Sequence, residues 1–98
     1  MANECFDDIW DALEDTPEEA VNMRLRSQLM RKLVERVRSW DISQKEAAKR
    51  LGITQPRLNN LLAGKVSAFS LDALVKLTVS AHLVLKVEVF DEELSDHA

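Results

Sequence analysis

Apolar residues recur at helical spacing along most of the chain, and this pattern predicts a largely helical protein. Between residues 17 and 39 the apolar residues follow one stripe, which predicts a long helix with a single buried face. The residues of that face are Val21, Leu25, Leu29, Leu33, Val37 and Trp40. A shorter stripe near the N-terminus predicts a separate amphipathic helix within an acidic arm, residues 1–15; it consists of Phe6, Ile9, Trp10 and Leu13.

Residues that favour helix starts and stops divide the rest of the chain. Hydroxyl side chains that can cap a helix N-terminus stand at four positions: Thr16, Ser43, Thr54 and Ser70. Pro17 suits the first position of a helix, and Glu19 and Glu46 complete capping boxes with Thr16 and Ser43. Gly52 predicts the end of the helix that begins after Ser43, because a left-handed C-cap is easiest for glycine.

After His82 the helical pattern gives way to strict alternation, which predicts a β-strand over residues 83–90. One face of this strand consists of Leu83, Leu85, Val87 and Val89. A lone strand leaves its backbone groups unpaired, and the sequence predicts no second strand. We therefore expect antiparallel pairing with a second copy of the chain, the alternative being a strand folded onto its own helices. An acidic tail, residues 91–98, follows.

Charge changes this picture because it is unevenly distributed. The net charge of -4 and the pI of about 5.1 suggest an acidic protein. However, residues 1–20 hold eight acidic and no basic side chains, residues 21–66 hold eleven basic against three acidic ones, and residues 67–98 hold two against six. A basic middle between acidic ends favours partners of both charge signs. Ordinary solvated faces are the alternative.

Several kinds of chemistry have no candidate residues. One cysteine, Cys5, two histidines and two glycines offer no internal disulfide, no metal-ligand spacing and no phosphate-binding loop. We therefore expect no catalytic activity, no metal and no cofactor. No apolar run approaches the roughly 20 residues that span a bilayer, so we expect no membrane partner. A single cysteine is typical of a reducing, cytoplasmic location.

The helix expected after Thr54 has an unusual surface. Its leucines, Leu58, Leu61 and Leu62, share one face, whereas Pro56 and Asn60 lie opposite, with Gln55, Arg57 and Asn59 on the flanks. A capped helix, a glycine, two residues and a second capped helix together have helix-turn-helix spacing. Glutamine and asparagine can bond adenine bidentately, and arginine can bond guanine. The pattern favours a DNA-reading helix over an ordinary amphipathic surface helix.

The stretch "SQKEAAKRLGITQPRLNNLLAGK" resembles the Cro and phage-repressor group of helix-turn-helix proteins, also called the XRE family. The resemblance implies an all-α, lambda-repressor-like bundle of about five helices, with one C-terminal β-strand that pairs across a dimer. Residues 16–82 would form the DNA-binding domain. Its expected partner is double-stranded DNA carrying a palindromic operator.

The resemblance also implies roles for single residues. Gln44 would contact phosphate and brace the second helix, Gln55 would read a base, and Lys65 would reach the DNA backbone. The full set of expected DNA contacts is Ser43, Gln44, Thr54, Gln55, Pro56, Arg57, Asn59, Asn60 and Lys65. Two positions depart from the family, because Val37 and Leu62 stand where many relatives bury an Arg–Glu pair. An apolar replacement of such a pair is often neutral or stabilising.

The wider frame, "EEAVNMRLRSQLMRKL" before the motif and "FSLDALVKLTVSAHLVLKVEV" after it, resembles the small XRE-type antitoxins of HigBA-like toxin–antitoxin modules. This implies a homodimeric repressor that controls its own operon and neutralises a basic, RelE-like RNase toxin. Phe6, Ile9, Trp10 and Leu13 would bind that toxin, or would pack on the domain instead. The alternatives are a stand-alone or phage-type XRE regulator without a toxin, and a protein-interaction adaptor.

Overall fold

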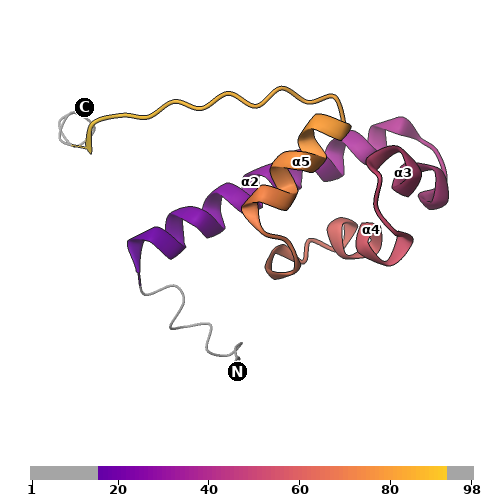
Figure 1. The fold of residues 1–98 in the computed structure, drawn as a ribbon, viewed down its shortest axis with the longest axis horizontal. Coiled ribbons are helices and arrows are strands. Elements are labelled where there is room, and N and C mark those ends of the chain that lie inside the picture. Colours follow the sequence, from indigo (N-terminus) through magenta and orange to yellow (C-terminus); the bar gives the residue numbers. More distant parts are fainter. Residues whose placement is uncertain (1–15, 93–98) are drawn as a thin grey trace.

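The computed structural model describes residues 16–92, which form four α-helices and one short 3-10 turn. In chain order these are α2 (Pro17–Trp40), α3 (Gln44–Leu51), α4 (Gln55–Leu62), η1 (Val66–Ala68) and α5 (Leu71–Ser80). Figure 1 shows α5 lying along α2, with α3 and α4 grouped near the C-terminal half of α2. The helix expected over Phe6 to Leu13 lies outside the described residues.

All four predicted N-caps are confirmed. In each case the hydroxyl oxygen accepts a hydrogen bond from the backbone N–H three residues later, at 3.1–3.2 Å. The pairs are Thr16 with Glu19, Ser43 with Glu46, Thr54 with Arg57, and Ser70 with Ala73. Each such cap contributes about 1 kcal/mol, which explains why the helices begin where the sequence predicts.

Gly52 ends α3 as expected. Its φ of 72° lies in the left-handed region, and its N–H donates to the carbonyl of Lys49 at 3.1 Å. A Cβ at this position would meet no neighbouring atom within 4 Å, so backbone conformation rather than space requires glycine here. The turn that follows, Gly52 to Thr54, is short enough to bring α4 directly against α3.

The core lies where the four helices and η1 meet. Its fully buried large side chains come from several different parts of the chain: Leu33, Leu58, Leu61, Phe69 and Leu74. On α3 the buried residues are Ala47, Ala48 and Leu51, as the sequence predicted. Small alanines let neighbouring backbones approach closely, and fully burying each leucine contributes about 1.5–3 kcal/mol.

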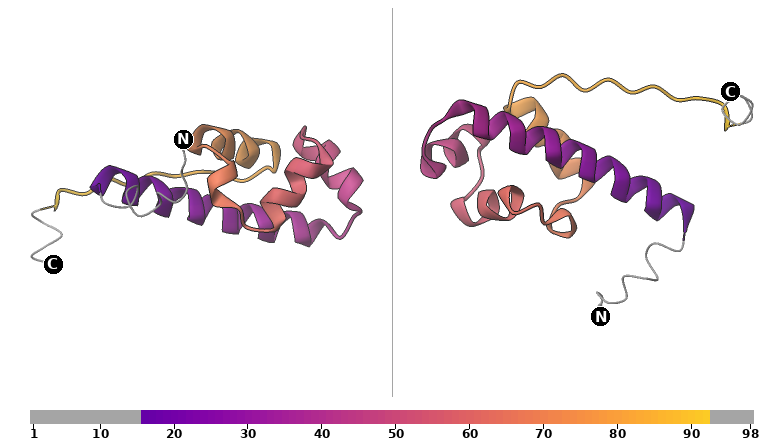
Figure 2. Two further views of the ribbon diagram at one scale, coloured as in Figure 1. Left: turned by 90° about the horizontal axis from the view of Figure 1, so that it is seen from below. Right: turned by 180° about the vertical axis from the view of Figure 1, so that it is seen from behind.

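The predicted buried face of α2 is wrong in its first turns. Val21 and Leu25 are 45% and 42% exposed, whereas Met30, which the prediction omitted, is 3% exposed. The reason is the length of α2: its first turns extend beyond α5 (Figures 1 and 2). The buried stripe is therefore Met30, Leu33 and Val37, and it begins later than the apolar pattern indicated.

The segment 83–90 is extended, and within residues 16–92 of this single chain no β-strand forms. Val87 and Val89 are 76% and 88% exposed, and the alternative, a strand folded onto its own helices, stays an open prediction. Leu83 is half-buried against the core, and Leu85 lines a groove formed by α2 and α5. Pairing with a second copy is not tested by one chain and stays a prediction.

Candidate nucleic-acid interface

Helices α3 and α4 form a helix-turn-helix unit whose second helix is firmly anchored. Leu58 and Leu61 are fully buried, and Leu62 is half-buried against the core. Pro56 occupies the first turn of α4, where a missing N–H leaves no intrahelical hydrogen bond unmade. The leucine face predicted for this helix is confirmed, and the opposite side of α4 is free to contact another molecule.

The outward side of α4 carries uncharged polar side chains. Gln55, Pro56 and Asn59 are exposed, and Asn60 is half-buried. The sequence placed Asn60 directly opposite the leucines, but the turn after α4 folds back on this end of the helix. The N–H of Lys65 donates to the carbonyl of Asn60 at 3.0 Å. Lys65 itself is exposed beside this last turn.

The N-terminus of α3 lies beside α4. Ser43 caps α3, and the exposed Gln44 lines a hollow together with Leu58 and Leu62 of α4. This position agrees with a bracing role toward α4. Val37 lines the same hollow, so Val37 and Leu62 face one common space between α2 and α4. The N-termini of α3 and α4 also offer N–H groups that favour phosphate.

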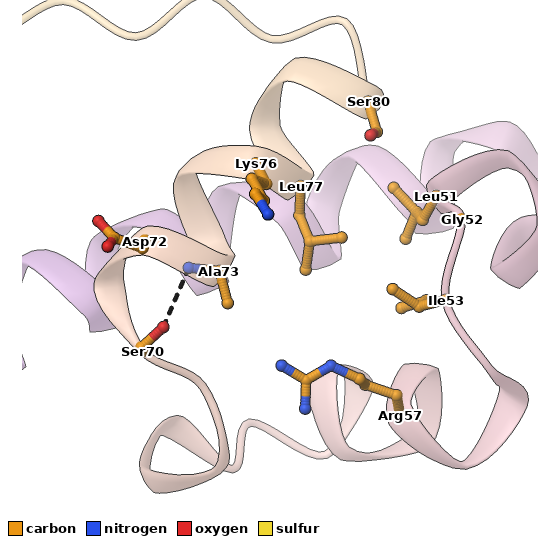
Figure 3. A pocket seen from close by; sticks show the side chains of 10 residues that line it. All are labelled: Leu51, Gly52, Ile53, Arg57, Ser70, Asp72, Ala73, Lys76, Leu77 and Ser80. Atoms are coloured by element: carbon orange, nitrogen blue, oxygen red, sulfur yellow. Dashed lines mark hydrogen bonds between the residues drawn. The ribbon is translucent and has the colours of Figure 1, made fainter.

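Arg57, another expected DNA contact, has partners within the protein. Its guanidinium lies over the ring of Phe69, 4.3 Å from the ring centroid, and Nη1 donates to the carbonyl of Ala68 at 3.4 Å. Figure 3 shows its side chain in a hollow between α4 and α5, with Ser70, Asp72 and Lys76 on the other side. In this structure Arg57 therefore faces the protein rather than the solvent in front of α4.

A second arginine, Arg26 on α2, holds the same loop and was missed by sequence reasoning. Its Nη1 donates to the carbonyls of Val66 and Phe69 at 3.2 and 3.3 Å. Its Nε donates to the side-chain oxygen of Asn22 at 2.7 Å. A signal was present, because residue 26 precedes Met30, Leu33 and Val37 at helical spacing and so shares the buried face of α2.

Basic side chains around the motif remain open to phosphate. Within the described part of the chain, neither Lys45 on α3 nor Lys65 after α4 forms an ion pair with a carboxylate. Arg50 lies over the ring of Trp40, 5.0 Å from its centroid. Trp40 is half-buried and packs at the edge of the core. The surface around α3 and α4 thus joins amide side chains with cations that are available to phosphate.

Neither a metal centre nor a membrane-crossing helix is found among residues 16–92. No three or more His, Cys, Asp or Glu side chains come together there as metal ligands. No helix in that range is long and apolar enough to cross a bilayer.

Comparison with known proteins agrees with this geometry. The model of one protein family, described as a helix-turn-helix domain, matches residues 12–89. A search of curated proteins found no match. The matched residues include every described helix and almost all of the extended segment 83–90. Since the match covers most of the chain and includes α3, the turn and α4, the protein belongs to the family of helix-turn-helix domains, which bind DNA.

Proposed function

We propose that this protein is a dimeric, sequence-specific transcriptional repressor that binds a palindromic operator in its own promoter. One observation carries the proposal: α4 is anchored by fully buried Leu58 and Leu61 while it presents exposed Gln55 and Asn59 to solvent. In a helix-turn-helix protein the second helix enters the major groove, where amide side chains suit base edges.

The DNA contacts divide by chemistry. Gln55, Asn59 and Asn60 read base edges, and Pro56 offers only apolar contact, for example to a thymine methyl. Ser43, Gln44, Thr54 and Lys65 contact phosphates, since they lie at the two helix N-termini and after α4. Phosphate contacts position the protein, and the base contacts supply its specificity.

The dimer forms through residues 83–90. Their backbone is extended, and the alternating side chains include the exposed Leu85, Val87 and Val89. Pairing with a second copy would satisfy the backbone groups and cover these apolar side chains. A two-fold dimer of this kind presents two α4 helices about one DNA turn apart, roughly 34 Å.

We further propose that the protein is the antitoxin of a HigBA- or RelE-like module and neutralises a basic RNase toxin. The acidic, amphipathic arm of residues 1–15 supports this, because its apolar stripe and its carboxylates suit a basic partner. The toxin contacts are Phe6, Ile9, Trp10 and Leu13, which lie outside the described residues. A stand-alone regulator without a toxin remains the alternative, and the family match is equally compatible with it.

The direct test measures binding of the purified protein to a labelled duplex from upstream of its own gene and to a scrambled duplex. Wild type should prefer the promoter, and its affinity should fall with rising salt because phosphate contacts release counterions. Gln55→Ala should weaken promoter binding by roughly 5- to 150-fold, since one bidentate base contact is lost. The matched control is Gln28→Ala, an exposed glutamine on α2. Equal affinity for both duplexes would contradict the repressor function.

A further inference from the structure

The base-reading helix has few side chains that suit a G·C pair. Its sequence, QPRLNNLL, contains one basic residue, Arg57, and no acidic residue. Arginine and lysine are the side chains that bond guanine bidentately in the major groove, and carboxylates accept from cytosine. Arg57 is thus the one side chain of α4 with a strong preference for either base of a G·C pair.

Arg57 is already engaged within the protein. Its guanidinium lies 4.3 Å from the centroid of the Phe69 ring and donates to the Ala68 carbonyl at 3.4 Å. Bonding to guanine O6 and N7 would require the same guanidinium to extend into the groove in front of α4. The side chain cannot occupy both positions, so reading guanine would break both contacts.

The loop that Arg57 holds is itself fixed from the opposite side. Phe69 is 1% exposed, so its ring is part of the core. Its carbonyl oxygen accepts from Arg26, and Arg26 is anchored on α2 and bonded to Asn22. Arg57 on α4 and Arg26 on α2 therefore clamp η1 and Phe69 between them, and this clamp links the reading helix to α2.

The hollow around Arg57 agrees with a retained guanidinium. It has a volume of about 580 Å³, which leaves room for the guanidinium, and Figure 3 shows the carboxylate of Asp72 pointing away from Arg57. Lys76 also lines the hollow, but it opposes the guanidinium only as an exposed, strongly hydrated charge. The stacked position over Phe69 is supported by packing as well as by charge.

We propose that Arg57 is a positioning residue that holds α4 against the Phe69 loop, and that the base pairs facing α4 in each operator half-site are consequently A·T pairs. The amides of Gln55, Asn59 and Asn60 bond adenine, and Pro56 contacts a thymine methyl. This inference rests on the proposed function, because it names the DNA sequence class that the same interface recognises.

The test selects bound sites from a random duplex library with the full-length protein and then measures affinities with each variant fully folded. Wild type should enrich A·T pairs opposite α4. Arg57→Gln should bind every duplex about tenfold more weakly while keeping the same base preference. The DNA affinity of Arg57→Lys should lie between those of wild type and Arg57→Gln. Lysine can still donate to the Ala68 carbonyl, but it has no planar group to stack on the Phe69 ring. Arg24→Gln, which removes an exposed positive charge from α2 outside the helix-turn-helix unit, should match wild type.

Three results would overturn the inference. One is an enriched guanine opposite α4 in the site that wild type selects, whether or not that preference depends on Arg57. Another is unchanged affinity in folded Arg57→Gln, which would leave Arg57 without a positioning role in DNA binding. If no sequence is enriched at all, the proposed function fails, and thermal unfolding without DNA then tests the clamp formed by Arg57 and Arg26. An unchanged Tm in Arg57→Gln would overturn the clamp, and a lower Tm would support it. If Arg57→Gln does not fold, the base pairs selected by wild type and the DNA affinity of Arg57→Lys test the inference instead.

Discussion

Arg26 on α2 donates a hydrogen bond to the carbonyl oxygen of Phe69 at 3.3 Å, although the two residues are 43 positions apart in the chain. The same guanidinium also bonds Val66, so one side chain satisfies two carbonyls of the loop between α4 and α5. This loop sets the direction in which the chain leaves α4 and enters α5.

Replacing this arginine should therefore destabilise the fold. Arg26→Met keeps an apolar stem of similar length but leaves the part-buried carbonyl of Phe69 without a protein donor, which costs about 1–3 kcal/mol. The carbonyl of Val66 loses one of two hydrogen bonds and keeps the one from the N–H of Phe69. For a domain of this size each kcal/mol lowers Tm by about 4–8 °C, which thermal unfolding followed by circular dichroism would measure. Arg24→Met is the matched control, because Arg24 is exposed on the same helix. Equal Tm values for the two variants would contradict the clamp.

The extended segment 83–90 should control the oligomeric state. Val87→Pro removes a backbone donor and restricts the chain in the middle of the proposed strand, so it should convert the dimer to a monomer at micromolar concentration. Sedimentation velocity would measure this change. Glu92→Pro, placed after the segment, should remain dimeric. A dimer that survives Val87→Pro would place the interface elsewhere.

The N-terminal arm should separate the two proposed activities. Deleting residues 1–15 leaves the Thr16 cap of α2 intact, so the DNA-binding domain should still fold and bind its operator. Neutralisation of a basic, RelE-like toxin encoded by a neighbouring gene should be lost, as an RNase inhibition assay would record. Trp10→Ser in the full-length chain should give the same loss. If the deletion abolished both activities, the arm would instead be a structural part of the domain.

The sequence alone determined the features that depend on neighbours within one helical turn. The caps formed by Ser43 and Thr54, the left-handed turn at Gly52 and the leucine face of α4 all follow from residue types spaced by one to four positions. Such interactions form between residues that the helix itself brings together, so their geometry is contained in the local pattern. Helix positions and the outward placement of Gln55 were predictable for this reason.

Only the tertiary structure decided which partner each long side chain has and which part of α2 is buried. Val21 and Leu25 match the helical pattern as well as Met30 does, but α5 covers α2 only beyond those first turns. Arg57 is an expected DNA contact by its sequence position, and only the fold shows that Phe69 and Ala68 lie within its reach. An arginine side chain spans several ångströms, and its contacts depend on elements that are distant in sequence and meet only after folding.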